Sequence, residues 1–347
     1  MDRPAVRGVF LADTHLGIDW PMKPRVTRRR RGDDFFGNYV SVLQHAIEGG
    51  FDFVLHGGDL FYRSRVPDSL VVKVFEPLLD VAEAGVDVYI VPGNHERSRI
   101  PESLFAGHPR IHVFDRPRSY VLKRHGRTVE LTGFPFMGSR MGSTFTHLAA
   151  ALEKTWQSRA DIRLLCIHEI VEGARVGPSD FQFRSGPDVI RGADIPRDYA
   201  AVLSGHIHRH QALAAGPNGR TFPVAVYYPG SIERTSFAEA DEEKGFLELD
   251  LIPGFSARWV PLPTRPMVTL VLDPGELTRL SNPQSLLAQR ILENHPDSVL
   301  RIKFTSPPSQ ALSSLFAAAN LRAIAPRMNI TLSGMGGQRS RFQGRRG

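Results

Sequence analysis

The chain has 347 residues, 41% of them hydrophobic and 23% charged, which excludes a disordered chain and suits one large domain with a smaller one. Its net charge is +7, with 37 arginines against 6 lysines. Such a surface favours phosphate-bearing polyanions, although codon bias in a GC-rich genome explains the arginine excess equally well. The single cysteine, Cys166, excludes an internal disulfide and reads as a core residue. No apolar run approaches the roughly 18 residues of a membrane helix, so we expect a soluble, cytoplasmic protein without a membrane partner.

The first part of the chain alternates buried strands with amphipathic helices. Strands are expected at residues 8–12, 53–56 and 87–91, and helices at 35–48 and 67–84. This order predicts an α/β fold, in which helices cover the faces of a parallel sheet.

A basic loop at residues 23–32 separates the first strand from the first helix and contains Arg28, Arg29, Arg30 and Arg31 in a row. Because this loop follows a strand that ends in polar residues, it is expected at the rim of the active site, where it would track a nucleic-acid backbone. We therefore predict that Arg28, Arg29 and Arg30 contact the substrate. The alternative is a solvated turn without a function.

The middle of the chain is less regular. Residues 97–115 are expected to form an irregular loop, and 173–196 a long structureless loop of the kind that usually has a function. A helix is expected at 145–158. The expected strands are 120–122, 129–133, 162–167, 201–203, 224–228, 245–250 and 257–260. We expect the last three of them to be antiparallel and to close a second sheet.

Three prolines between residues 261 and 266 mark a linker. We predict a large domain over residues 1–262, a small βαβαβ domain over 267–333 and a disordered, basic tail at 334–347. The elements expected in the small domain are strands at 268–272, 299–304 and 329–332 and helices at 285–293 and 310–320.

Five apolar runs of the large domain end abruptly in polar side chains. The central run ends in Gly57-Gly58-Asp59, where the glycines let the backbone and a ligand approach closely. Each motif alone occurs by chance and has an ordinary structural explanation, but five such ends in one chain indicate a metal centre. The candidate ligands are Asp13, His15, Asp59, Asn94, His168, His206 and His208.

This set of oxygen and imidazole donors suits paired divalent ions. Two such ions about 3.5–4 Å apart activate a water molecule and hold a phosphoryl group for in-line displacement. The absence of a thiolate from the set favours Mn²⁺, Fe or Zn²⁺ over copper or an iron–sulfur cluster. The other histidines are interpreted as structural. Two of them, His56 and His210, lie beside the motifs and are candidates to hydrogen-bond to the metal ligands without binding the metal.

The polar blocks resemble those of the calcineurin-like metallophosphoesterases: Asp-x-His, Gly-Asp, Gly-Asn-His-Glu, His and Gly-His-x-His. Within that superfamily the chain resembles the SbcD and Mre11 DNA-repair nucleases, and the similarity covers about residues 7–260. The matching segments are residues 12–17, 58–61, 91–96, 228–237 and 242–246. The resemblance implies a sandwich of two mixed β-sheets flanked by helices. It also implies, more loosely, that the small C-terminal domain is an α+β cap that helps to hold DNA.

The resemblance also implies roles for individual residues. Asp13, His15, Asp59 and His208 would bind one metal, and Asp59, Asn94, His168 and His206 the other, with Asp59 bridging two ions that are expected to be Mn²⁺. A hydroxide activated by the two metals would attack the phosphodiester. His95 would protonate the leaving 3′-oxygen or stabilise the charge of the transition state.

The chain departs from the family at two points. Many Mre11 proteins have a second catalytic histidine at the position where this chain has Tyr62, which is followed by Arg63. We expect Tyr62 and Arg63 to contact the substrate. Because this histidine is missing, the balance of exonuclease and endonuclease activity stays open. The helices that bind the SbcC or Rad50 ATPase are not evident, so that partner stays open too. A homodimer is suggested by relatives alone.

Three functions fit these observations. The leading hypothesis is a Mn²⁺-dependent DNA nuclease that acts in DNA repair. The alternative is a metallophosphoesterase for small substrates, such as a cyclic nucleotide or a phosphomonoester, which needs no extended basic surface. A catalytically inactive DNA-end binder is the third, and it would be expected to lack some of the ligands.

Overall fold

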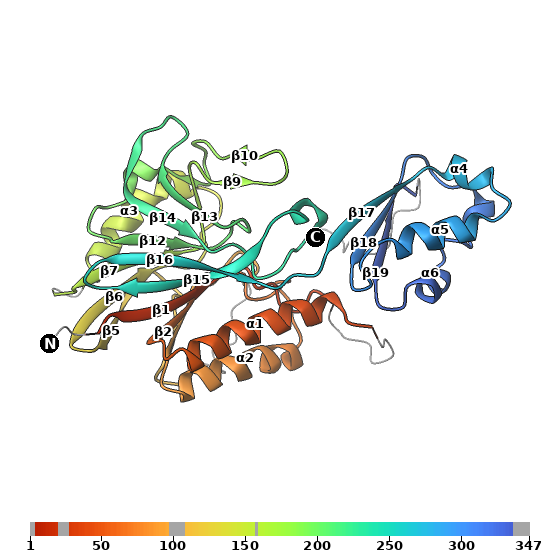
Figure 1. The fold of residues 1–347 in the computed structure, drawn as a ribbon. Coiled ribbons are helices and arrows are strands. Elements are labelled where there is room, and N and C mark those ends of the chain that lie inside the picture. Colours follow the sequence, from red (N-terminus) through yellow and green to blue (C-terminus); the bar gives the residue numbers. More distant parts are fainter. Residues whose placement is uncertain (1–3, 20–27, 97–107, 157–158, 336–347) are drawn as a thin grey trace. The chain divides into compact units, whose positions relative to one another are not determined.

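The computed structural model describes residues 4–19, 28–96, 108–156 and 159–335, and they divide into two compact units (Figure 1). The large unit contains the described parts of 1–23, 32–235 and 242–264. The small unit contains the described parts of 24–31, 236–241 and 265–347. None of the described helices is long and apolar enough to cross a membrane.

The first sheet of the large unit has the strand order β16-β15-β1-β2-β3-β4. Its strands are β1 (Val6–Leu11), β2 (Phe53–His56), β3 (Asp87–Ile90), β4 (Ile111–Val113), β15 (Lys244–Leu251) and β16 (Phe255–Leu262). Strands β1, β2 and β3 are parallel, as predicted from the alternation of strands and helices, and β4 pairs in parallel with β3. The expectation that β15 and β16 close the second sheet is wrong, because β15 pairs antiparallel with the free edge of β1. The predicted irregular loop also contains β4.

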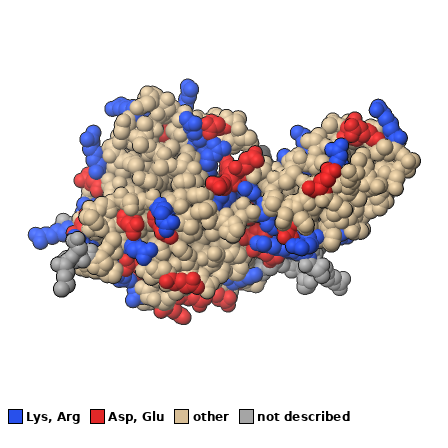
Figure 2. Space-filling model, viewed as in Figure 1, with Lys and Arg blue, Asp and Glu red and all other residues tan. Residues whose placement is uncertain are grey.

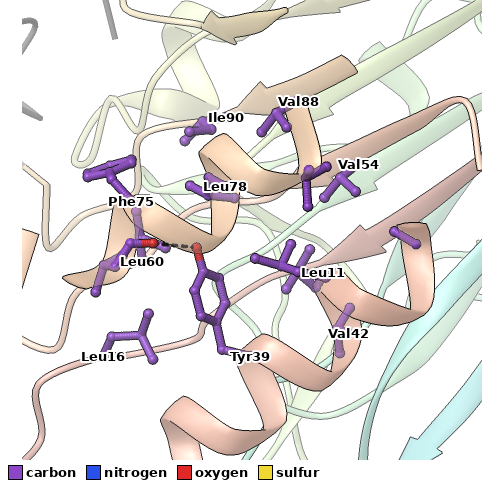
Figure 3. Close-up of a cluster of buried hydrophobic side chains, with 14 of the residues drawn as sticks. Leu11, Leu16, Tyr39, Val42, Val54, Leu60, Phe75, Leu78, Val88 and Ile90 are labelled. Carbon is purple, nitrogen blue, oxygen red and sulfur yellow. Dashed lines mark hydrogen bonds between the residues drawn. The ribbon is translucent and has the colours of Figure 1, made fainter. Parts of the chain in front are cut away.

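Helices α1 (Arg31–Glu48) and α2 (Asp68–Glu83) pack on the outer face of this sheet. Their apolar residues meet the alternate side chains of β1, β2 and β3, and Figure 3 shows Tyr39 and Val42 of α1 facing Val54 of β2. The buried Tyr39 hydroxyl donates a hydrogen bond of 2.9 Å to the Val74 carbonyl of α2. This bond joins the two helices within an otherwise apolar core.

The second sheet has the order β13-β14-β12-β7-β6-β5. Its strands are β5 (Arg118–Arg124), β6 (Arg127–Gly133), β7 (Ile162–Ile167), β12 (Ala201–Ser204), β13 (Gln211–Ala215) and β14 (Thr221–Tyr228). Helix α3 (Met141–Glu153) covers its outer face and begins and ends earlier than expected. The inner faces of the two sheets share one buried cluster that includes Phe10, Leu55 and Leu164. The large unit is therefore an α/β sandwich of two mixed sheets flanked by helices.

The segment expected as a structureless loop at 173–196 contains short regular pieces. Strands β9 (Arg175–Val176) and β10 (Phe181–Gln182) form a small antiparallel hairpin. Strand β11 (Val189–Ile190) pairs in parallel with β8 (Ile170–Val171), and the short 3-10 helix η2 spans Gly192–Asp194. Two-residue strands leave no periodic pattern in a sequence, so the prediction missed them.

The small unit contains a parallel three-stranded sheet of order β17-β18-β19. Its strands are β17 (Met267–Leu272), β18 (Val299–Phe304) and β19 (Asn329–Ser333), and its helices are α4 (Pro274–Thr278), α5 (Pro283–Leu292) and α6 (Ala318–Ile324). The helix expected at 310–320 is instead the 3-10 helix η4 (Gln310–Leu312) followed by α6. The segment 236–241 contains the 3-10 helix η3 (Phe237–Glu239). Most of the tail predicted at 334–347 lies outside the described residues.

Candidate metal centre

The carboxyl ends of strands from both sheets converge at one edge of the sandwich. Parallel pairing aligns the end of β1 with that of β2, and the Asp13 and His15 amides donate hydrogen bonds of 2.9 and 3.0 Å to the carbonyls of Gly58 and Asp59. Strands β7 and β12 are aligned in the same way in the second sheet. The seven residues predicted as metal ligands follow these four strands and β3, which pairs in parallel with β2 and precedes Asn94.

The first group of donors consists of Asp13, His15 and His208. Their ligand atoms lie within 4.8 Å of one another. The Nε2 atoms of His15 and His208 are 3.0 Å apart, and His208 Nε2 lies 3.9 Å from an Asp13 carboxylate oxygen. Asp13 also accepts the amide of His206. Three donors from two sheets thus point at one place.

The second group consists of Asp59, His168 and His206, whose ligand atoms also lie within 4.8 Å of one another. His168 Nε2 lies 3.5 Å from Asp59 Oδ1 and 3.2 Å from His206 Nδ1. The amide oxygen of Asn94 is 3.2 Å from His168 Nε2 and 2.8 Å from His206 Nδ1. Asp59 also reaches the first group, because its other oxygen lies 4.0 Å from His15 Nε2.

The electrostatics of the cluster follow from its burial. Burial raises the pKa of Asp13 to about 6, against the charges of His168 and His208, which lower it. Burial also opposes ionisation of Asp59, but the charge and hydrogen bond of His168 prevail and hold the pKa of Asp59 below its ordinary value. The same pairing outweighs burial at His168 and raises its pKa to about 9. Burial lowers the pKa of His206 to about 3.

These donors fit a divalent cation. Asp59 is held ionised and His206 neutral, which are the protonation states in which carboxylates and imidazoles bind metals. A cation that binds between Asp59 and His168 would take the place of the proton that the pair shares. The buried oxygen and nitrogen donors suit Mn²⁺, Fe or Zn²⁺.

The backbone of the cluster is strained and closely packed. Asp13, His15, Asp59 and His206 all have positive φ angles, of 52°, 43°, 53° and 82°. Such strain is typical of functional sites, where the surrounding fold enforces it. Gly58 has a φ of 103°, and a Cβ atom added to it would lie 2.3 Å from Nδ1 of His168. The Gly-Asp motif therefore needs its glycine so that the second sheet can bring His168 to Asp59.

His95 lies beside the cluster in an open pocket of about 270 Å³. Its Nδ1 is 2.7 Å from the Tyr62 carbonyl, which only accepts hydrogen bonds, so Nδ1 carries the hydrogen and Nε2 is directed to Asp59, 3.8 Å away. The ring is about one-third exposed. The pocket is lined by His15, Asp59, Tyr62, Asn94, His95, His206, His208 and Thr235.

Two supporting residues were not assigned a role from the sequence. Glu96 is buried and accepts the amides of Asp59, Phe61 and Gly93 at 3.0, 2.9 and 2.7 Å. Thr235 Oγ1 lies 3.3 Å from His208 Nδ1. The only signal for either was its place in a motif, Glu96 after Gly-Asn-His and Thr235 in the 228–237 block.

The residues predicted to contact substrate are only partly brought together. Tyr62 lines the pocket, and the exposed Arg63 holds its guanidinium carbon 5.9 Å from the centre of the Tyr62 ring. Arg28, Arg29 and Arg30 belong to the small unit, where the Arg29 carbonyl accepts a hydrogen bond of 2.9 Å from Asn329. Their predicted place at the rim of the pocket stays a prediction. His56 supports the site from behind, 3.0 Å from the Thr14 hydroxyl.

Residues 7–210 match the family model of the calcineurin-like phosphoesterases. The chain belongs to this family. Members use two divalent metal ions, and the Asp and His groups described above are its candidate metal-binding groups. The family is one of metal-dependent hydrolases of phosphate esters.

Individual relatives are distant. The DNA double-strand break repair protein Mre11 of Methanococcus maripaludis is 24% identical over 247 residues, which are 68% of this chain and 59% of that protein. The uncharacterized metallophosphoesterase YhaO of Bacillus subtilis is 25% identical over 250 residues, 69% of this chain and 56% of YhaO. The chain thus spans less than two-thirds of the length of these relatives. A dimetal phosphatase from Danio rerio aligns with a TM-score of 0.44 and 11% identity, over 75% of this chain and 100% of its own.

Proposed function

We propose that this metallophosphoesterase is a Mn²⁺-dependent DNA nuclease that hydrolyses phosphodiester bonds in DNA repair. The observation that carries the proposal is the pair of adjacent donor groups, which approach each other where Asp59 lies 4.0 Å from His15, with His95 beside them in one pocket. Support for DNA as the substrate comes from the Mre11 relatives, which are named as double-strand break repair proteins. The proposed nuclease activity covers both cleavage from DNA ends and cleavage within a strand.

In this proposal, one cation would be held by Asp13, His15, Asp59 and His208, and the other by Asp59, Asn94, His168 and His206. Such a pair of cations, when bound, supplies Lewis-acid polarisation of the phosphoryl oxygens and activation of water. Manganese is the proposed metal, with Fe or Zn²⁺ as alternatives that the donor set also accepts.

The protein's own contribution begins with fixed ring orientations. His168 donates from Nδ1 to the Gly57 carbonyl at 2.7 Å, which turns its Nε2 to the cluster. Hydrogen bonds of this kind orient metal-binding histidines and are costly to remove. His95 is fixed in the same way by the Tyr62 carbonyl. Its Nε2, once protonated, is placed to donate that proton to the oxygen that leaves the phosphorus.

Recognition of DNA would use the groups around the pocket. The Tyr62 ring forms part of the pocket wall and Arg63 lies exposed beside it. On the face drawn in Figure 2, basic and acidic side chains are interspersed, so the charge of +7 does not form one basic patch there. We therefore assign phosphate contacts to local arginines, Arg63 and the predicted Arg28, Arg29 and Arg30. The small unit is proposed as a cap that helps to hold DNA.

The test is Mn²⁺-dependent digestion of end-labelled linear and closed circular DNA, with bis-p-nitrophenyl phosphate and p-nitrophenyl phosphate assayed in parallel. We expect linear DNA to be degraded and the His95→Ala variant to be slower by about 10²–10⁴-fold, the usual contribution of a general acid. Asp59→Asn should abolish the activity, because it weakens both donor groups at once.

The matched control is His147→Ala, which removes an exposed histidine of α3 outside the pocket and should leave all rates unchanged. Cleavage of the circular DNA would report endonuclease action. Hydrolysis of the monoester alone, with DNA untouched, would refute the nuclease and leave an enzyme for small phosphomonoesters.

A further inference from the structure

The hairpin of β9 and β10 presents an aromatic ring to solvent. Phe181 is 58% exposed and is the one exposed Phe, Tyr or Trp among the described residues. Its neighbour on the hairpin, Phe183, is half-buried and packs against the core of the large unit. The two rings meet edge to face, with centroids 5.2 Å apart, so Phe183 supports Phe181 from within.

Residues that directly follow His208 hold this hairpin in place. Arg209 donates to the Asp180 carboxylate and to the Gly177 carbonyl of the hairpin turn, both at 2.7 Å. Gln211 accepts the Arg175 amide at 2.8 Å and donates to the Arg175 carbonyl at 2.9 Å. The base and the turn of the hairpin are therefore both attached to the segment that leaves the candidate metal centre.

This attachment places the hairpin close to the pocket. Arg209 is adjacent to His208, and consecutive Cα atoms are about 3.8 Å apart. The guanidinium of Arg209 contacts the hairpin turn directly, through its hydrogen bond to the Gly177 carbonyl. Arg209 is itself fixed by Glu242, which accepts its Nε at 3.0 Å and also pairs with Lys244. Phe181 follows Asp180 directly and shares this fixed position.

The charges around Phe181 favour an anionic ligand. Asp180 is paired with both Arg175 and Arg209, each at 2.7 Å, so its negative charge is neutralised. Arg175 and Arg184 are exposed on either side of the ring in the sequence. Proteins bind single-stranded nucleic acids with exposed aromatic rings that stack on bases and with cationic side chains that contact the backbone, and the segment around Phe181 supplies both kinds of side chain.

We propose that Phe181 is a stacking platform for an unpaired nucleobase of the DNA strand whose phosphodiester enters the pocket. The proposal rests on the proposed function and names its substrate more closely, as a strand that is single-stranded beside the scissile bond. A folded protein partner would be expected to need a larger apolar patch than one ring. Stacking tolerates any base, so no sequence preference is expected from this contact.

The test is binding of two labelled oligonucleotides in EDTA, which separates binding from hydrolysis. One is an ordinary single strand; the other has the same phosphates but a run of abasic sites. We expect the native protein to bind the ordinary strand more tightly. Phe181→Ala should weaken that binding by about tenfold and leave the abasic strand unchanged, since loss of one stacked base has about this effect.

Phe181→Trp should restore the affinity, and its added fluorescence should be quenched by the ordinary strand but not by the abasic one. Val72→Ala, which removes an exposed apolar side chain of α2, serves as the control and should change neither affinity. The proposal is overturned if Phe181→Ala binds both strands like the native protein, or if the native protein does not distinguish them. Hydrolysis of bis-p-nitrophenyl phosphate should be normal in Phe181→Ala; its absence in the native protein would instead refute the proposed function.

Discussion

Replacement of Glu96 tests how the candidate metal centre is held together. This buried carboxylate accepts three amides, from Asp59 and Phe61 after β2 and from Gly93 after β3. It thereby ties the loop that presents Asp59 to the loop that presents Asn94 and His95. Burial and the charge of Asp59 raise the pKa of Glu96 to about 7, against the amides of Phe61 and Gly93. At pH 8 the ionised form predominates, so measurements belong there.

The expected loss of stability follows from those three bonds. Glu96→Ala leaves three buried donors without a partner, at about 1–3 kcal/mol each. Water that enters the space left by the side chain would recover part of this, so we expect the free energy of unfolding to fall by about 3–5 kcal/mol. Glu96→Gln keeps the shape but turns an NH₂ group toward at least one amide donor, and we expect a loss of about 2 kcal/mol.

The two variants are to be compared by urea unfolding in EDTA and by hydrolysis of bis-p-nitrophenyl phosphate with Mn²⁺. We expect Glu96→Gln to lower the rate by about 10–100-fold, the usual effect of removing a group that orients metal ligands. Glu153→Gln, an exposed glutamate of α3, is the matched control. A loss below about 1 kcal/mol for Glu96→Ala would contradict the role assigned to these hydrogen bonds.

Two further outcomes are expected. Gly58→Ala should lower the rate of phosphodiester hydrolysis by at least about 10²-fold, because the new Cβ would meet Nδ1 of His168 at 2.3 Å and the φ of 103° disfavours alanine. The control is Gly37→Ala on α1, where a Cβ meets nothing within 4 Å, and this variant should be active and slightly more stable. Equal rates of hydrolysis in the two variants would contradict the argument that Gly58 is needed for close packing. Mn²⁺ at 100 times its dissociation constant should raise the free energy of unfolding of the native protein by about 2.7 kcal/mol, measured by thermal or urea unfolding. Asp59→Asn should lose this stabilisation and His147→Ala should keep it. If Mn²⁺ still stabilises Asp59→Asn, the metal binds elsewhere.

The candidate metal centre was predictable because its signals are local. Each ligand follows an apolar run within a few residues, and the carboxyl ends of neighbouring parallel strands lie at one edge of their sheet. Asp13 and Asp59 were therefore expected together at the edge of one sheet, whereas it is the packing of the two sheets that brings His206 to them. The two mixed sheets of the family fold are confirmed by the observed topology. The parallel sheet of the small unit follows the predicted alternation of strands and helices.

Other features depended on contacts between distant segments. Strand β15 pairs with the edge of β1, where backbone hydrogen-bonding groups would otherwise be unpaired. The sequence of β15 has the same pattern of hydrophobic residues whichever sheet it joins, so the sequence could not decide between the two sheets. The roles of Glu96 and Arg209 required the positions of their partners, 37 and 29 residues away. The sequence by itself determined which side chains gather at the strand ends; the tertiary structure decided what supports them, because hydrogen bonds between separate loops leave no periodic trace in a chain.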